Sequence, residues 1–206
     1  MRHSYMVIFP VATVFAISAF LAIVAVDTAE ANSFENVTGG VDYLHYSGRD
    51  DQPSYNAYKF RMGSNVFNDN VSVDLSTEFG DEEDSPNSYN QLEAGVRGVW
   101  QFPYSDIVGL YGRAAVGQMW NSGESNFPYW SIEPGVELYV SENVKGNVGY
   151  RYRNAFDDEK YSFETNAALV GVEWMVTKNH GVNVGYEYSG KDQKYDMLGI
   201  GYTYSF

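Results

Sequence analysis

The chain has 206 residues and a formal net charge of −14 at pH 7, with 13 Lys and Arg against 27 Asp and Glu. This balance argues against nucleic acid as a partner, because phosphate binding needs clustered Lys and Arg side chains. The absence of Cys excludes a disulfide framework and a lipid-attachment cysteine. The abundance of Tyr (18), Phe (12) and Gly (20) favours β structure.

The N-terminal segment has the pattern of a secretory signal peptide. Arg2 and His3 precede an apolar run over residues 6–26, and Ala29-Glu30-Ala31 then offers a small-residue cleavage site. We therefore predict that residues 1–31 form a signal peptide. The alternative is a retained membrane helix, since about 20 apolar residues can span a bilayer.

The remaining residues, 32–206, suit one domain. No apolar stretch among them reaches the length of a membrane helix, so any crossing there must use strands. Segments with period-2 alternation recur at steady spacing, separated by turn-rich pieces. Ten strands are predicted, at residues 37–47, 55–66, 70–80, 89–102, 107–121, 127–140, 143–154, 161–176, 181–189 and 194–206. An even count returns both ends of a barrel to the same side.

The connections between these strands fall into two alternating sets. The first set consists of tight turns, at residues 67–69, 103–106, 141–143 and 178–181. The second set is somewhat longer, at residues 48–54, 81–88, 122–126, 155–160 and 190–193. It contains the two strongest acidic runs, at residues 81–84 and 157–159. Short turns on one side and longer polar loops on the other are typical of transmembrane β-barrels.

Two strands break the simple alternation. Pro134 lies within the strand at 127–140, and a bulge there would accommodate a residue that cannot donate to the ladder. In the strand at 161–176, Tyr161 and Phe163 have the opposite parity to Ala168 and its apolar successors. This indicates a second bulge, or the end of a hairpin that rises above the membrane.

On the apolar face of the strands, the type of side chain changes along the length of the strand. Aliphatic and small residues fill the middles, and aromatic residues gather toward both ends. Such bands match the two interfaces of a bilayer, whereas the interior of a soluble barrel has no reason to sort its aromatics in this way. The predicted belts are Phe79, Trp120, Trp130, Tyr152 and Tyr188 near the longer loops, and Trp100, Phe102 and Trp174 near the tight turns.

The opposite face carries ionisable residues. Strand parity predicts fifteen that point inward: Asp42, Lys59, Arg61, Asp74, Glu78, Glu93, Arg97, Arg113, Glu133, Glu137, Lys145, Arg151, Arg153, Glu173 and Glu187. This set has a net charge of −1, so most of the negative charge falls on loops, turns and ends. Because buried charges need partners, we predict a salt-bridged lumen, narrowed further by Tyr111, Tyr129 and Tyr139, and an acidic rim.

Residues suited to catalysis or metal binding are scarce. His45 lies near Asp50 and Asp51, a weak candidate for activating water, and His180 falls in a predicted turn as a solvated residue. No G-x-S-x-G, HExxH or P-loop motif is present. The acidic run at 81–84 could hold Ca²⁺ or Mg²⁺ loosely, but it lacks the spaced ligands of an EF-hand loop. We predict no enzyme activity, no cofactor and no metal site.

The alternation continues to the last residue of the chain. Tyr202, Tyr204 and Phe206 share one face of the final strand, although soluble chain ends usually fray. This strand, the signal peptide and the aromatic belts resemble small bacterial outer-membrane β-barrels of the OmpA/OmpX-like and porin-like superfamily. The resemblance implies that these three aromatic residues form the signal read by the barrel-assembly machinery. It also implies contact with outer-membrane lipid and lipopolysaccharide, and a monomer.

The expected fold is an all-β, transmembrane, antiparallel up-and-down barrel in the bacterial outer membrane. Ten strands are expected, although merging two hairpin arms would restore the eight of OmpA/OmpX-type barrels. The preferred function is a structural or surface-interaction role, with a salt-bridged lumen that does not conduct. The alternatives are a narrow porin for small solutes or cations and, less favoured, a surface hydrolase that uses His45.

Overall fold

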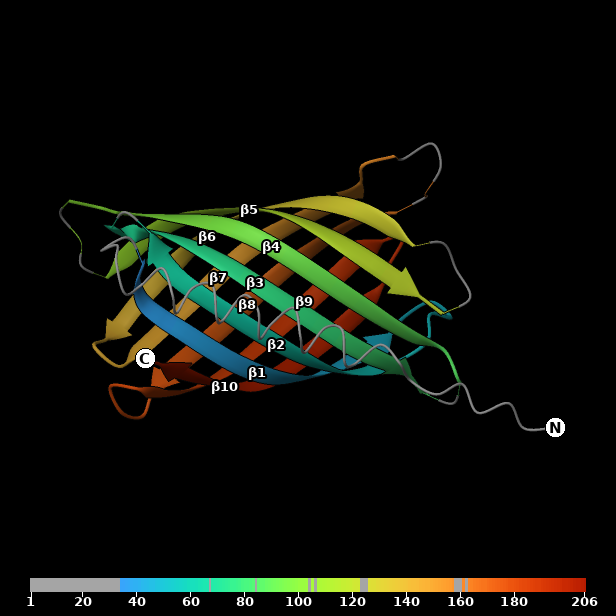
Figure 1. Ribbon diagram of the computed structural model, residues 1–206, viewed down its shortest axis with the longest axis horizontal. Helices are drawn as coiled ribbons and strands as arrows, with labels where there is room; N and C mark the ends of the chain where they lie inside the picture. Colours follow the sequence, from blue (N-terminus) through green and yellow to red (C-terminus); the bar gives the residue numbers. More distant parts are fainter. Residues whose placement is uncertain are drawn as a thin grey trace.

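The computed structural model describes residues 34–66, 68–83, 85–103, 105, 107–122, 126–157, 161 and 163–206. The predicted signal peptide, residues 1–31, lies outside these residues. The described chain forms ten antiparallel strands that close into one barrel (Figure 1). Their bounds are β1 (Phe34–Gly48), β2 (Tyr55–Val66), β3 (Asn68–Glu82), β4 (Ser88–Gln101), β5 (Val108–Asn121), β6 (Phe127–Ser141), β7 (Val144–Ala155), β8 (Glu164–Met175), β9 (His180–Lys191) and β10 (Tyr195–Ser205).

Each strand pairs with its neighbour in sequence, and β1 pairs with β10 to close the barrel. The prediction of ten strands is confirmed, the eight-strand alternative is excluded, and no predicted strand boundary is more than three residues from the observed one. Among the described residues, no helix is long and apolar enough to cross a membrane. We call the end with the C-terminus and the β8–β9 turn the turn end, and the opposite end the loop end (Figure 1).

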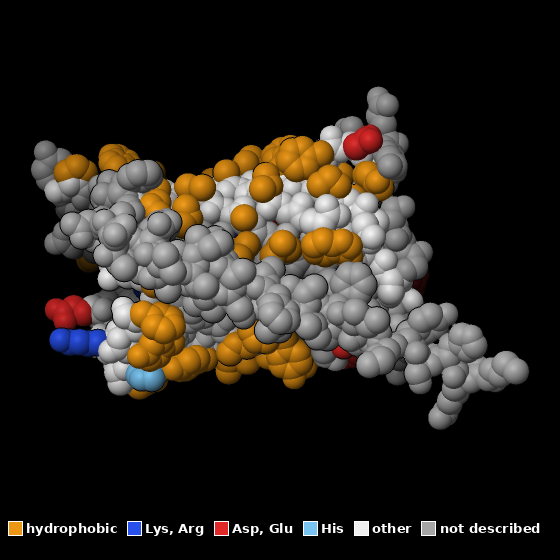
Figure 2. Space-filling model, in the orientation of Figure 1, with side chains coloured by type: hydrophobic (Ala, Val, Ile, Leu, Met, Phe, Trp, Pro, Cys, Tyr) orange, Lys and Arg blue, Asp and Glu red, His pale blue; other side chains and the backbone are white. Residues whose placement is uncertain are grey.

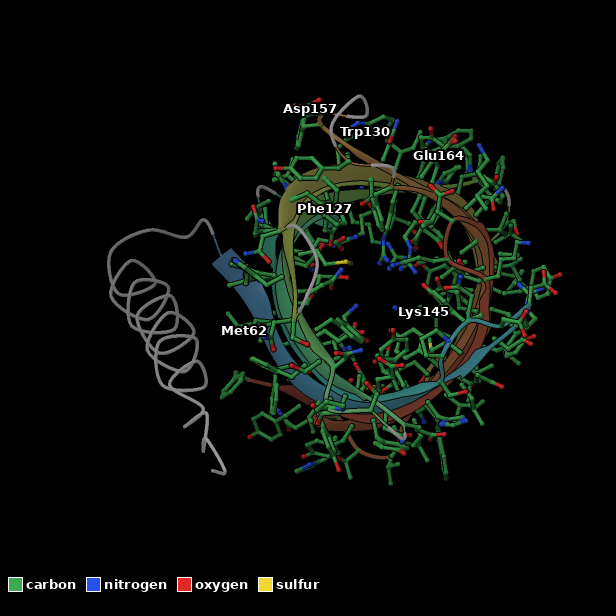
Figure 3. The ribbon with its side chains drawn as sticks, turned by 90° about the vertical axis from the view of Figure 1, so that its right-hand side faces the viewer. Met62, Phe127, Trp130, Lys145, Asp157 and Glu164 are labelled. Atoms are coloured by element: carbon green, nitrogen blue, oxygen red, sulfur yellow. The ribbon has the colours of Figure 1, made fainter. Side chains whose placement is uncertain are left out.

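The barrel is apolar outside and charged inside. On its outer wall Val96, Val116 and Val148 are more than half exposed, whereas Glu93 and Glu187 are buried within. Hydrophobic side chains run along the wall in Figure 2. The end-on view of Figure 3 shows Phe127 and Lys145 within the ring of strands and Trp130 outside it. Such an exterior is stable in a hydrocarbon solvent, where closure pairs every backbone group.

The bulge predicted at Pro134 is wrong. β6 keeps one register with β5 on both sides of the Gly112–Pro134 pair, and the β6–β7 pairs at Ile132 and Gly135 also share one register. Pro134 has no N–H, so the pairing with β7 is interrupted only between Ile132 and Gly135 and then resumes in the same register. Register shifts occur instead near strand ends, at Glu35/Thr38, Asn65/Val66 and Tyr139/Ser141.

The bulge predicted in the eighth strand is also wrong. β8 begins at Glu164, and its register with β7 and β9 is uninterrupted. Tyr161 and Phe163 therefore precede the strand, which agrees with the alternative of a hairpin end. The Phe163 ring packs on Phe127 and Tyr129, with centroids 4.7 and 5.8 Å apart. With Met119 and Ala155, these three residues form an apolar cluster inside the loop end of the barrel.

Candidate functional site

The inward charges of β3, β4 and β5 form one network. The Nη1 of Arg113 donates to Glu93 at 2.7 Å, and its Nε and Nη2 both donate to Asp74. Glu93 also accepts a hydrogen bond from the Tyr129 hydroxyl at 2.8 Å. Arg97 lies directly across the ladder from Arg113, and such a like-charge pair is destabilising by itself. The two guanidinium groups relieve it by turning to different acids.

A second network lies at the seam where the barrel closes. Arg61 on β2 donates to both carboxylate oxygens of Asp42 on β1, at 2.7 and 3.0 Å. The same guanidinium donates to Asn183 on β9 at 2.8 Å and to Thr203 on β10 at 3.0 Å. The Asn183 amide then donates to Asp42 at 2.9 Å. These four side chains connect the first two strands with the last two.

Arg97 and Arg151 make most of the contacts on the side of the lumen built by β4–β9. Arg97 pairs with Glu137 at 2.5 Å and lies over the ring of Tyr111, with its guanidinium carbon 4.0 Å from the ring centroid. Arg151 pairs with Glu187 and approaches Glu133 at 4.0 Å. The remaining contacts on this side are Lys145 with Glu137 and Glu173, Tyr111 with Glu133, and Tyr139 with Glu137.

Arg153 differs from the other predicted lumen charges. The other fourteen each take part in an ion pair; the one not yet described joins Lys59 and Glu78, 3.8 Å apart. Arg153 makes no ion pair within 4 Å to a described residue, and its buried Nε has no hydrogen-bond partner there. Its guanidinium carbon lies 5.7 Å from the centroid of the Tyr129 ring. Among the described residues, this buried cation is therefore stabilised by the electrostatic field of nearby charges and not by a direct ion pair.

Solvent reaches the lumen unevenly. Glu93 and Glu187 are each 2% exposed and Arg153 is 5% exposed. By contrast, the side chains of Lys145 and Arg61 are 40% and 31% exposed. All the lumen ion pairs between described residues join strands that are adjacent or two apart, so they follow the wall rather than cross the axis.

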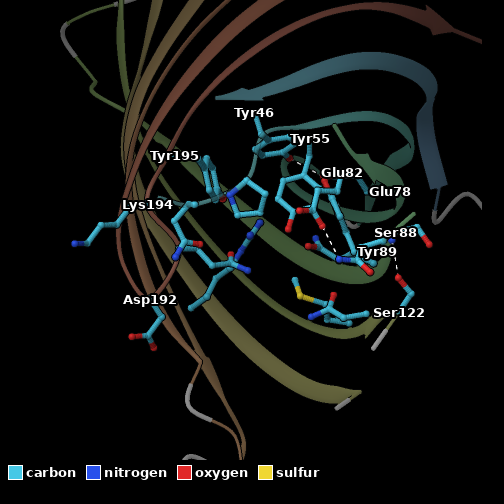
Figure 4. Close-up of a pocket in the computed structure, with 18 residues that line it drawn as sticks. Tyr46, Tyr55, Glu78, Glu82, Ser88, Tyr89, Ser122, Asp192, Lys194 and Tyr195 are labelled. Carbon is cyan, nitrogen blue, oxygen red and sulfur yellow. Dashed lines mark hydrogen bonds between the residues drawn. The ribbon is translucent and has the colours of Figure 1, made fainter. Parts of the chain in front are cut away.

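Sequence reasoning missed a cluster of inward tyrosines at the loop end. Tyr46 and Tyr89 both donate hydrogen bonds to Glu78, and Tyr195 donates to Glu187 at 3.2 Å. Strand parity could have found all three, because Tyr46 has the parity of Asp42, Tyr89 that of Glu93 and Tyr195 that of Thr203. Together with Tyr55 they line a pocket of about 680 Å³ (Figure 4).

The predicted aromatic belts lie on the outer wall. Trp130 packs on Tyr152 with centroids 5.4 Å apart, and Trp100 packs on Phe102 at 4.8 Å. Trp100, Trp174 and Tyr188 are exposed there, and Phe79, Phe102, Trp120, Trp130 and Tyr152 are half-buried. At the end of β10, Tyr202 and Phe206 are exposed, and Tyr204 packs against Phe206 at 4.8 Å.

A family model described as the outer membrane protein beta-barrel domain matches residues 16–175. The chain belongs to this family. The match explains the apolar outer wall, because a barrel in a membrane faces lipid there. The protein is therefore a barrel of the bacterial outer membrane. No curated protein matches the chain significantly.

Solved barrels share the fold of this outer-membrane barrel at low sequence identity. The β domain of the Bordetella autotransporter BrkA is 11% identical, with a TM-score of 0.52, over 83% of this chain and 99% of that one. An outer membrane channel from Pseudomonas putida F1 is 9% identical, with a TM-score of 0.52, over 86% of this chain and 97% of that one. At such identities the likeness shows the fold alone.

Of the three histidines in the chain, the two in the described residues lie on the outer wall of this outer-membrane barrel, away from the lumen. His180 is the first residue of β9 rather than a turn residue, and its Nδ1 lies 2.6 Å from the Tyr202 hydroxyl. The Nδ1 of His45 lies 2.9 Å from the Asn56 amide oxygen and 3.7 Å from Glu83. The acid beside His45 is therefore Glu83, and Asp50, one of the two predicted partners, pairs instead with the Lys194 ammonium at 2.9 Å.

The acidic runs do not assemble a metal site in the described chain. Glu82 accepts a hydrogen bond from Asn87 at 2.8 Å, and Glu83 accepts one from Asn56 at 2.7 Å. Residue 84 of the first run and residues 158 and 159 of the second lie outside the described residues. Among the described residues, no group of three or more His, Cys, Asp or Glu side chains could hold a metal ion.

Proposed function

We propose that the protein is a non-conducting outer-membrane barrel with a structural or surface-interaction role. The observation that carries this proposal is the near-complete burial of Glu93, Glu187 and Arg153 inside the lumen. The cost of removing a charged group from water is several kcal/mol, so the wall of an open aqueous channel keeps its charges hydrated. The dehydration of this layer of charges supports a lumen closed to water at their height.

The packing around that layer supports the same conclusion. Tyr129 is fully buried and bonded to Glu93, and Tyr195 reaches Glu187 from the next strand. The apolar cluster defined above fills part of the lumen on the loop side. Eight strands enclose a lumen that side chains fill, and ten strands with this many inward tyrosines leave little additional space.

Planar-bilayer recording of the folded protein tests the proposal. The wild-type protein should show no steady conductance. A double variant Tyr129→Ala/Tyr195→Ala should open measurable steps, because it removes the two rings bonded to the buried Glu93 and Glu187. The outward variant Tyr150→Ala is the matched control and should stay silent, because its exposed ring faces lipid. Large open steps in the wild-type protein would refute a sealed lumen.

A narrow pore for small solutes or cations is the second candidate. It is favoured by the partial exposure of Arg61, Lys145 and Arg97, which indicates water in the turn half of the lumen. Only the buried layer then separates this water from the pocket at the loop end. In this case Arg97→Ala or Arg113→Ala should change conductance or ion selectivity. Traces that stay unaltered would count against it.

The C-terminal aromatic residues are proposed as the signal read during assembly. Phe206 is 72% exposed on the outer wall, and its backbone N–H donates to the Val37 carbonyl at 2.9 Å. Its ring is therefore free for recognition while its backbone completes the seam. Phe206→Ala should lower the amount of folded barrel in outer membranes, whereas Phe60→Ala, an exposed ring elsewhere, should not.

A further inference from the structure

The pocket at the loop end is a preformed concavity in the mouth of the barrel. Its volume is about 680 Å³, within the range of sites for small ligands. Strands β1–β5, β7 and β10 and the loops after β1, β3, β5 and β9 contribute to its lining (Figure 4). It lies on the loop side of the buried charge layer, so a ligand can enter it without crossing the barrel.

Four tyrosine rings form one part of the pocket wall. Tyr46 packs edge-on against Tyr195 at 4.8 Å between centroids, and Tyr55 packs edge-on against Tyr89 at 5.5 Å. Tyr46 and Tyr89 are also near-perpendicular, at 6.4 Å. The hydroxyls of both donate to Glu78, which fixes the ring orientations. The rings thus offer flat apolar faces that need no reordering when a ligand arrives.

Arg153 lines the same pocket, and its buried Nε has no acceptor among the described residues. Arg153 is 5% exposed and forms no ion pair within 4 Å with a described residue. A guanidinium carries five N–H donors in a fixed fork, and burying them unpaired is costly. A ligand that brings acceptor oxygens to this guanidinium would recover part of this cost.

The charges around the pocket restrict the ligand. Three acids (Glu78, Glu82 and Asp192) and two bases (Arg153 and Lys194) line it. Because the acids outnumber the bases and the protein as a whole is strongly acidic, a multiply charged anion is repelled. Arg153 at the same site opposes an organic cation. The amides of Gln52, Gln91 and Gln193 supply neutral donors and acceptors. The remaining class is a neutral molecule with one flat apolar face and an edge rich in hydroxyls.

We propose that this pocket binds a neutral saccharide, as a single sugar or a disaccharide. The C–H face of the sugar ring packs on the tyrosines, and its oxygens accept hydrogen bonds from Arg153 while its hydroxyls donate to carboxylates such as Glu82. This inference goes beyond a sealed barrel, because it assigns the mouth a ligand. Sugar binding in the pocket does not depend on whether the lumen conducts. The conductance test and the binding test can therefore fail separately, and their failures are distinguishable.

Calorimetric titration tests the assignment. The full protein, purified in lauryldimethylamine oxide rather than a sugar-based detergent, is titrated with glucose, galactose, N-acetylglucosamine, lactose and maltose. Glucuronate and choline serve as the anionic and cationic comparisons. At least one neutral sugar should bind with a Kd of about 1 mM or tighter. A parallel titration with dextran distinguishes a free sugar from the end of a surface glycan, and binding of either supports the proposal.

Two variants connect any binding to the pocket. Arg153→Met and Tyr195→Leu should each weaken it at least about tenfold. Arg97→Met is the matched control, because Arg97 also has a buried unpartnered Nε but lies outside the pocket lining, and it should leave the Kd unchanged. Should Arg153→Met not fold, Arg153→Lys keeps the charge, loses the planar fork and should show the same loss.

Three results would overturn the assignment. The first is that no neutral sugar binds the folded protein. The second is that choline or glucuronate binds while the neutral sugars do not. The third is that both pocket variants bind sugar as well as the wild type does, which would place the site elsewhere.

Discussion

Arg61 holds Asp42 with two hydrogen bonds, at 2.7 and 3.0 Å, just beside the seam between the first and last strands. The same guanidinium reaches Asn183 and Thr203 across that seam. Backbone pairing closes the barrel through the β1–β10 ladder alone. This side-chain network adds a second connection inside the lumen, where lipid cannot compete for its hydrogen bonds.

Arg61→Met should destabilise the folded barrel by about 2–4 kcal/mol, because it leaves the buried Asp42 carboxylate without its cation. Urea unfolding in lipid vesicles measures the loss. Lys145→Met, which removes a cation from a wetter position, should cost less. The double variant Asp42→Asn/Arg61→Met should recover part of the loss. Equal costs for Arg61→Met and Lys145→Met would contradict a special role for the seam.

Tyr129→Phe should cost about 1–3 kcal/mol, since it removes a hydrogen bond to the buried carboxylate of Glu93 and nothing else. The matched control is Tyr186→Phe, which removes a 2.9 Å hydrogen bond to Asp196 on the exposed wall. Its effect should stay below about 0.5 kcal/mol. Both values come from the same unfolding experiment, and similar costs would show that Glu93 does not depend on Tyr129.

Gly117→Ala should destabilise the barrel by about 1–3 kcal/mol through overpacking. A Cβ at this position would collide with the ring of Tyr129, which lies flat against the Gly117 backbone. Gly98 is the control, because a Cβ there meets no atom within 4 Å. Gly98→Ala should therefore be close to neutral. A neutral Gly117→Ala would mean that the Tyr129 ring can move aside, and the buried layer would then be looser than described.

The Asp50–Lys194 contact predicts a local pH dependence in an exposed loop. The hydrogen bond from the Lys194 ammonium, with its charge, lowers the pKa of Asp50 below its ordinary value. The contact therefore contributes at pH values above the unfolded pKa and is lost as the pH falls through the lowered value. NMR titration of the Asp50 carboxyl should show this lowered pKa, and Lys194→Met should raise it. An unchanged titration would exclude the contact in solution.

The sequence by itself determined the architecture of this protein. Period-2 alternation in segments such as 89–102 and 194–206 identified the strands, because side chains on a strand can only face one way or the other. The same parity placed Asp42, Glu93 and Glu187 inside, since ionised groups cannot face hydrocarbon. Local irregularities such as β-bulges were harder to predict from the sequence. Pro134 suggested a bulge, but the neighbouring pairs on both sides hold β6 in register.

Only the tertiary structure decided which side chains meet. Tyr46, Tyr89 and Tyr195 come from three separate strands, and closure of the barrel brings them to one pocket. Parity states that a residue faces the lumen, but strand tilt and stagger decide the height at which it does so. For that reason Arg113 forms ion pairs with two acids. Arg153 also points inward but forms no ion pair with a described residue.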